Sequence, residues 1–188
     1  MNETATMNQA GAPDAHGVLT GPTTLTIKRM LPGPIERCFA YLTESDLRRQ
    51  WLAAGEMEMR VGAEFELTWR NDELTDPPGT RPAGFGAEHR MASRITALDP
   101  PRKLAFTWGE GGGEGGGEVA IELTPVGGKV LMTLVHTRLA DRSTQLNVSA
   151  GWHAHLDVLA ARMEARDAGV FWDDWAGLKA EYERLLPG

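Results

Sequence analysis

Two histidines near the C-terminus have the most informative chemistry in this sequence. The segment 149–163, SAGWHAHLDVLAARM, contains His153 and His155. Imidazole can bind metal ions and can transfer protons near neutral pH. Residues two apart on a helix, however, point about 160° away from each other. The spacing therefore excludes a metal site made by this pair alone.

His136 and His155 are the best candidates for catalysis, because both are expected to face the interior. Apolar surroundings disfavour the charged imidazole, so either ring could act as a base or anchor a ligand. The alternative for each is a core histidine bonded to a backbone carbonyl or to water. His89, His136 and His155 would meet at a metal ion only through the fold, which spacing does not indicate. We therefore predict no catalytic residue and no metal site.

The remaining candidate motifs are weaker. Cys38, the single cysteine, shares the apolar side of a predicted helix and is expected to be a small core residue. The glycine-rich segment 109–117, GEGGGEGGG, lacks the Lys-Ser/Thr pair and the helix of a phosphate-binding loop. The sequence contains neither a P-loop nor a dinucleotide fingerprint, so no cofactor is expected.

Alternation of apolar and polar residues predicts the elements that would position these groups. Strands are expected at 23–30, 57–61, 65–69, 91–95, 104–108, 119–123 and 130–136. One face of each strand is apolar and the other polar, which is typical of an antiparallel sheet with one solvated face. That solvated face takes the charges of Glu58, Glu64, Glu66, Arg90 and Arg94.

Helical spacing predicts two short helices, starting near Pro34 and Ser45, and a long helix near the C-terminus. One face of the long helix carries Val148, Trp152, His155, Leu156, Leu159 and Met163, and His153, Asp157 and Arg162 point elsewhere. A further helix is expected at about 170–186. The segment 71–84 contains Asp76-Pro77-Pro78-Gly79 and is expected to be a mobile excursion.

Composition narrows the class of protein. The 188 residues carry 26 acidic and 19 basic side chains, a net charge of -7, which disfavours binding to nucleic acid. No apolar run is long enough to span a membrane, and no secretory signal is present. With one cysteine, these features lead us to expect a cytoplasmic protein. Residues 1–22 are expected to be a disordered leader containing a solvated His16, and 23–188 a single domain.

The order of strand, two short helices, six strands and long helix describes an α+β helix-grip fold, either START-like or Bet v-like. In this fold a curved, seven-stranded antiparallel sheet wraps around a long C-terminal helix. The sequence resembles the START-like SRPBCC superfamily and, within it, bacterial homologues of the C-terminal domain of the heat-shock-protein-90 ATPase activator. The resemblance covers about 23–166 and rests on IKRMLPGPIERCFAYLTESDLRRQWL, RITALDPPRKLAFTW, VLMTLVHTRL and GWHAHLDVLAARM.

The resemblance implies an apolar cavity between the sheet and the long helix. Large aromatic side chains in such a cavity suit a planar apolar ligand, although the same side chains could simply fill the core. The residues expected to line it are Trp51, Phe65, Trp69, Phe106, Trp108, Met132, Leu134, His136, Trp152, His155, Leu156 and Leu159.

We therefore expect a binding module for a small apolar or amphipathic molecule, including a lipid, rather than an enzyme. Two alternatives stay open: a cyclase-type or hydratase-type enzyme that uses His136 or His155, and a co-chaperone-like interaction protein. Phe171, Trp172 and Trp175 add apolar surface late in the chain, which also leaves a homodimer open.

Overall fold

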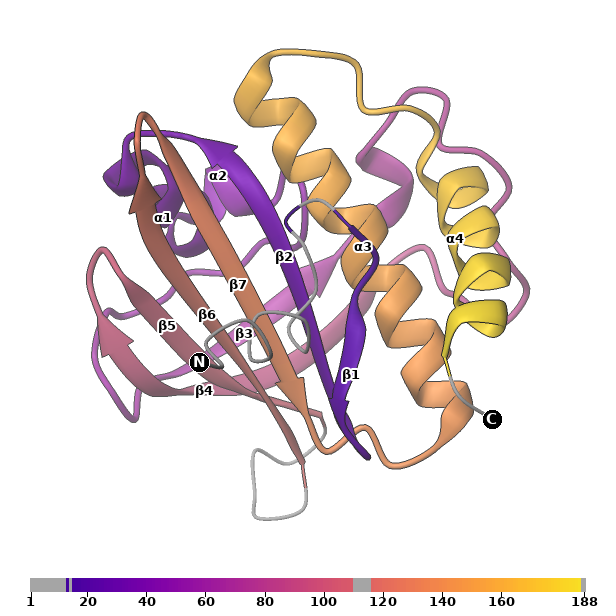
Figure 1. Ribbon diagram of the computed structural model, residues 1–188, viewed down its shortest axis with the longest axis horizontal. Helices are drawn as coiled ribbons and strands as arrows, with labels where there is room; N and C mark the ends of the chain where they lie inside the picture. The colour runs from indigo at the N-terminus through magenta and orange to yellow at the C-terminus, as the bar shows by residue number, and fades with distance from the viewer. Residues whose placement is uncertain (1–12, 14, 110–115, 187–188) are drawn as a thin grey trace, which may run out of the picture.

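A curved antiparallel sheet with two C-terminal helices forms the molecule (Figure 1). The computed structural model describes residues 13, 15–109 and 116–186. Seven strands follow the order β1–β2–β7–β6–β5–β4–β3, and all neighbouring strands are antiparallel. Their bounds are β1 Val18–Gly21, β2 Thr24–Pro32, β3 Glu64–Trp69, β4 His89–Asp99, β5 Lys103–Trp108, β6 Gly117–Val126 and β7 Lys129–Thr137.

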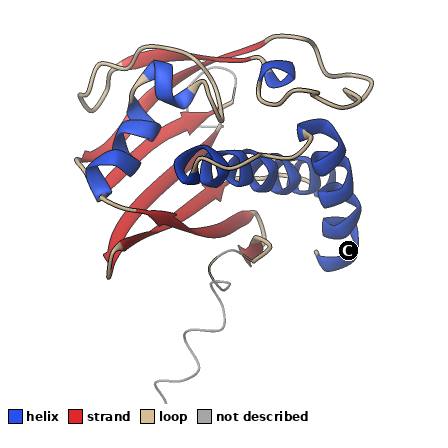
Figure 2. Cartoon of the chain, turned by 90° about the horizontal axis from the view of Figure 1, so that it is seen from above, coloured by secondary structure: helices blue, strands red, loops and turns tan. Residues whose placement is uncertain are grey.

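The helices lie on the concave side and at the ends of this sheet. They are α1 Ile35–Thr43, α2 Ser45–Arg48, α3 Arg142–Glu164 and α4 Phe171–Leu185, with a short 3-10 turn η2 at Asn71–Glu73. Figure 2 shows α3 running inside the curve of the strands and α4 crossing near one of its ends. The α+β helix-grip fold predicted from the sequence is confirmed.

Helix α3 is buried on two sides rather than along one stripe. Asp141 caps its start, where Oδ1 accepts a hydrogen bond from the backbone N–H of Thr144 at 2.9 Å. The sheet covers the predicted apolar face, and α4 packs along another face of the helix. His153, predicted to point away from the apolar stripe, is therefore also buried.

One predicted strand, 57–61, does not form. Met59 and Val61 are 40% and 54% exposed, although their alternation with polar residues is regular. Gly55 and Gly62 flank the segment with φ angles of +136° and +86°, which interrupt an extended backbone at both ends. Alternation alone does not make a strand where the backbone cannot pair with a neighbour.

The seventh strand is β1, which lies inside the expected leader. Val18 pairs with Thr26 and Leu19 with Leu25, so β1 extends the sheet beside β2. The prediction of disorder for 18–21 is wrong, because this segment contains Val18 and Leu19 and its backbone pairs with β2. Residues 1–12 and 14 of the leader lie outside the described residues, as does 110–115 of the glycine-rich segment.

The segment 71–84 packs on the molecule instead of leaving it. The backbone N–H groups of Phe171 and Trp172 donate to Thr75 Oγ1 and to the Pro78 carbonyl at 3.1 and 3.0 Å. The Trp172 indole N–H donates to Asp72 Oδ1 at 2.7 Å. The expectation of a mobile excursion is wrong, because the loop satisfies the free N–H groups at the start of α4.

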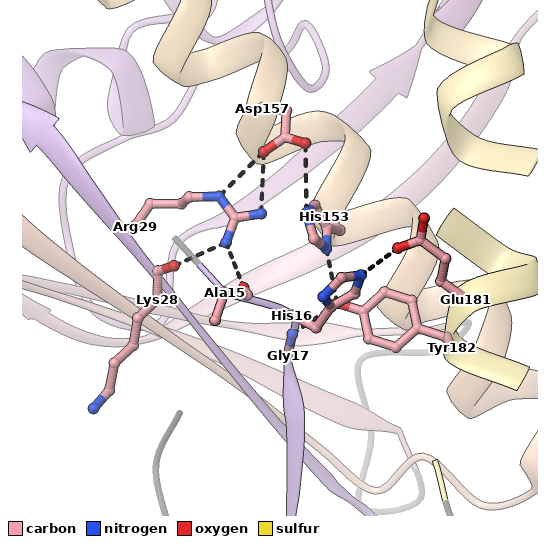
Figure 3. A network of polar contacts seen from close by, with 9 residues as sticks. All are labelled: Ala15, His16, Gly17, Lys28, Arg29, His153, Asp157, Glu181 and Tyr182. Carbon is pink, nitrogen blue, oxygen red and sulfur yellow. Dashed lines mark hydrogen bonds and ion pairs between the residues drawn. The ribbon is translucent and has the colours of Figure 1, made fainter. Parts of the chain in front are cut away.

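A polar network connects the N-terminal segment, β2, α3 and α4 (Figure 3). The Arg29 guanidinium, 3% exposed, donates to Asp157 Oδ1 at 3.1 and 3.2 Å. Asp157 Oδ2 lies 3.5 Å from His153 Nε2, and His153 Nδ1 lies 3.0 Å from the Tyr182 hydroxyl. Because a carboxylate only accepts, Nε2 carries the proton and Tyr182 donates to Nδ1.

His16 belongs to this network, contrary to the expectation of a solvated tail residue. Its Nε2 lies 2.6 Å from Glu181 Oε2, and the next residue, Gly17, donates its backbone N–H to the Tyr182 hydroxyl at 2.7 Å. The Tyr182 hydroxyl thus bonds both to His153 of α3 and to Gly17, so it holds the segment before β1 against α4.

Replacing Tyr182 with Phe tests this junction. The variant leaves the Gly17 N–H and His153 Nδ1 without their partner, so the free energy of unfolding should fall by about 1–2 kcal/mol. Urea denaturation followed by tryptophan fluorescence measures the change.

Tyr41→Phe is the matched control, because the Tyr41 hydroxyl makes no hydrogen bond within the described residues. Its effect should stay within about 0.5 kcal/mol. Equal losses in the two variants would contradict a stabilising role for the network.

Candidate functional site

A pocket of about 410 Å³ lies between α3, α4 and the part of the sheet formed by β3, β4 and β5. Its wall is mainly aromatic, and none of the described residues that line it carries a carboxylate, an ammonium or a guanidinium group. The lining residues are Leu52, Trp69, Asn71, Gly84, Phe85, Gly86, His89, Met91, Trp108, Asn147, Val148, Gly151, Trp152, His155, Phe171, Trp172 and Trp175.

Helix α3 supplies one wall through regular helical spacing. Asn147, Val148, Gly151, Trp152 and His155 follow one another by one, three, one and three residues, which places them on one face of the helix. A Cβ atom added to Gly151 would lie 4.0 Å from its nearest neighbour, Trp175 Nε1, so the glycine leaves open space between α3 and α4.

The sheet supplies the opposite wall. Trp69 and His89 are Cα partners on β3 and β4, and their rings lie 5.5 Å apart. The Trp108 ring bridges the two walls, since its centroid lies 5.5 Å from that of Trp69 and 5.2 Å from that of Trp152. Edge and tilted packing of this kind presents aromatic faces and edges to a ligand.

The third wall comes from α4 and the loop before β4. Phe171, Trp172 and Trp175 are buried, and the Phe85 ring lies 5.3 and 5.2 Å from the two indoles. Phe85 stands between two glycines and remains 41% exposed. It therefore covers the pocket at its boundary with solvent.

His155 is one of two histidines that line the pocket, and a backbone carbonyl determines its tautomer. Its Nδ1 lies 2.7 Å from the Trp51 carbonyl oxygen, which can only accept, so Nδ1 carries the proton. Nε2 then has a lone pair and no hydrogen-bond partner among the described residues. Burial lowers the pKa of His155 to about 4, against the opposing effect of the Trp51 carbonyl, so the ring is neutral at pH 7.

His136 lies behind the pocket and positions its wall. The Trp152 indole N–H donates to His136 Nδ1 at 3.0 Å, which fixes the orientation of the indole. Burial lowers the pKa of His136 to about 4, so this acceptor is also neutral at pH 7. His136 is thus occupied in a structural hydrogen bond, and it does not line the pocket.

The structure brings together Trp69, Trp108, Trp152 and His155 from the expected lining set. The others are buried but lie outside the pocket wall, because they interdigitate between α3 and the sheet and fill that space. These are Trp51, Phe65, Phe106, Met132, Leu134, His136, Leu156 and Leu159. The open volume is displaced from the expected centre towards α4.

Several lining residues were not expected from the sequence. Asn147, Val148 and Gly151 precede Trp152 and His155 at helical spacing, a signal that could have identified them. Phe171, Trp172 and Trp175, whose apolar surface leaves a homodimer open on the sequence alone, are 1%, 2% and 6% exposed because they pack within the chain. They therefore give no argument for a homodimer.

Cys38 and the other polar groups do not add a second reactive centre. The Cys38 thiol is buried and donates to the Pro32 carbonyl at 3.4 Å, and burial raises its pKa to about 11. In the described part of the chain, no cluster of three His, Cys, Asp or Glu side chains is arranged to bind a metal ion. A hollow of about 460 Å³ near Arg162 is lined mainly by polar and charged residues.

Comparison with known proteins places this geometry in a family. A family model described as activator of Hsp90 ATPase homolog 1-like protein matches residues 32–164. The chain belongs to this family. The resemblance stated from the sequence is thereby confirmed. No curated protein matches the chain.

Among the described residues, which are 13, 15–109 and 116–186, no helix is long and apolar enough to cross a membrane.

Solved structures show the same fold. The protein encoded by BPP1335 of Bordetella parapertussis is 41% identical, with 95% of each chain covered and a TM-score of 0.76. CalU16 of Micromonospora echinospora is 18% identical over 86% of this chain and 87% of its own, with a TM-score of 0.62. CV1439 of Chromobacterium violaceum is 22% identical over 76% and 99%, with a TM-score of 0.60.

The lowered pKa of His136 predicts acid sensitivity. Between pH 6.5 and about 4 the unfolded chain binds a proton at this site that the folded chain does not bind. The free energy of unfolding should therefore decrease as the pH falls through this range, by about 3 kcal/mol from His136 alone.

His136→Asn isolates this contribution, because the Asn Oδ1 can accept from Trp152 without titrating. Its stability should depend less on pH than that of the wild-type chain, as measured by urea denaturation at a series of pH values from 7 to 4. Parallel curves for the two proteins would contradict the assignment.

Proposed function

We propose that this protein binds a small, planar and largely apolar molecule in the aromatic pocket. The observation that supports the proposal is the pocket itself, about 410 Å³ and lined on three sides by indole and phenyl rings. Pockets of this size and composition are typical of small-molecule sites. The helix-grip fold of the family is compatible with this use, although the fold alone does not identify a function.

Fixed side chains support the idea of a preformed pocket. Trp152 is bonded to His136 and Trp172 to Asp72, so neither indole can turn into the space without losing a hydrogen bond. A binding site that is already open requires little ordering when the ligand enters, which favours affinity.

The enzyme alternative depends on His155 alone, because His136 is engaged by Trp152. The co-chaperone alternative, suggested by the description of the family, does not use the pocket. Both stay predictions, and the pocket geometry favours binding.

A substitution at Gly151 tests the proposal. Leucine at this position should improve the helix propensity of α3, because glycine costs about 1 kcal/mol in a helix. Its side chain would extend into the gap next to Trp175 and occupy the pocket. Affinity for the uncharged dye N-phenyl-1-naphthylamine, measured by its fluorescence increase, should fall about tenfold or more.

Gly177→Leu is the matched control. Gly177 is an exposed glycine of α4, and a Cβ atom there meets nothing within 4 Å. This variant should bind the dye like the wild-type chain. Failure of the wild-type chain to bind the dye, combined with native mass spectrometry that shows no co-purified molecule before organic extraction, would overturn the proposal.

A further inference from the structure

We infer that the ligand is an uncharged aromatic molecule that carries at least one O–H or N–H group. The inference rests on the proposed function and specifies the class of molecule that the same pocket accepts. Three observations carry it: the absence of charged side chains from the described pocket wall, the direction of the His155 proton, and two carboxamides whose oxygens are unpaired.

The pocket wall excludes a charged ligand group. No described lining residue carries a carboxylate, ammonium or guanidinium group, so a buried carboxylate, phosphate or ammonium of a ligand would lose its hydration without gaining such a counter-ion. The histidines that line the pocket are His89 and His155, and burial keeps His155 uncharged at pH 7. A neutral molecule is therefore favoured over an ion of the same shape.

His155 can serve a ligand only as an acceptor. Its Nδ1–H is committed to the Trp51 carbonyl, which cannot exchange roles, so Nε2 is an unprotonated nitrogen. A ligand that lacks a donor would cover this atom and leave it unpaired in an apolar site. A ligand O–H or N–H would instead satisfy it.

Asn71 and Asn147 add acceptors on different walls. The Oδ1 atoms of both residues are buried and have no hydrogen-bond partner among the described residues. The terminal torsion of an asparagine is broad, so each carboxamide can turn its oxygen towards a donor in the pocket. Asn147 and His155 are eight residues apart on α3, about 12 Å along the helix axis. A molecule with donors at both ends could reach both.

Calorimetric titration with shape-matched probes tests the inference on the wild-type chain. The probes are 2-naphthol, 2-fluoronaphthalene and 2-naphthoate, which differ in carrying a donor, no donor and a negative charge. Burying a hydroxyl without a partner is unfavourable, so a featureless apolar pocket should prefer the fluorinated probe. We expect 2-naphthol to bind about fivefold tighter than 2-fluoronaphthalene, and 2-naphthoate to bind most weakly.

Variants identify the acceptor. The preference for 2-naphthol should disappear in at least one of His155→Phe, Asn147→Leu and Asn71→Leu. Ser149→Ala is the matched control, because Ser149 Oγ is also buried and unpaired on α3 but does not line the pocket. This control should keep the preference. If one of the three pocket variants does not fold, the binding preferences of the other two decide the test.

The outcomes separate the inference from the proposed function. Tighter binding of 2-fluoronaphthalene or of 2-naphthoate overturns the inference and leaves the proposed function standing. Survival of the 2-naphthol preference in every folded pocket variant also overturns it. Failure of all three probes and of N-phenyl-1-naphthylamine to bind overturns the proposed function itself.

Discussion

The burial of α3 on two sides is the constraint on which the structure depends. A helix enclosed by a sheet and by a second helix has little contact with water, so its buried histidines pair inside the protein. His153 meets Tyr182, and His155 meets the Trp51 carbonyl. On the facing strand, His136 accepts from Trp152. Burial lowers the pKa of all three histidines, so these pairings involve neutral rings.

Two hydrogen bonds hold large rings at the border of the pocket. Because His136 and Asp72 hold the indoles of Trp152 and Trp172, large rings border an empty volume instead of collapsing into it. The rest of the interior is filled by interdigitated side chains. One of these hydrogen bonds starts on α3 and the other on α4, so each helix holds a large ring at the border of the pocket.

Local patterns predicted the frame of this molecule well. The alternation in β3 to β7 reflects a sheet with one buried face, and the spacing around Trp152 reflects a helix against that face. The wrong predictions concern segments whose structure depends on contacts with distant parts of the chain. Residues 57–61 alternate but lack a partner strand, and β1 is only four residues long but pairs with β2. The local sequence of a segment does not indicate which other segment will lie beside it and pair with its backbone.

The candidate site was predictable only where one element determined it. Trp152 and His155 follow from helical spacing, and Trp69 and Trp108 from strand alternation. The remaining wall depends on the loop that contains Phe85 and on α4, which meet only in the folded chain. His153 shows the same limit, because its burial results from α4 and not from its own helix face.

Helix α4 begins at Phe171, after the family-matched region has ended at residue 164. The matched region therefore contains α1, α2, β3 to β7 and α3, whereas the segment after it supplies three of the aromatic rings that line the pocket. A chain that kept the matched region but had small residues in place of Phe171, Trp172 and Trp175 would keep the scaffold and lose one aromatic wall of the pocket.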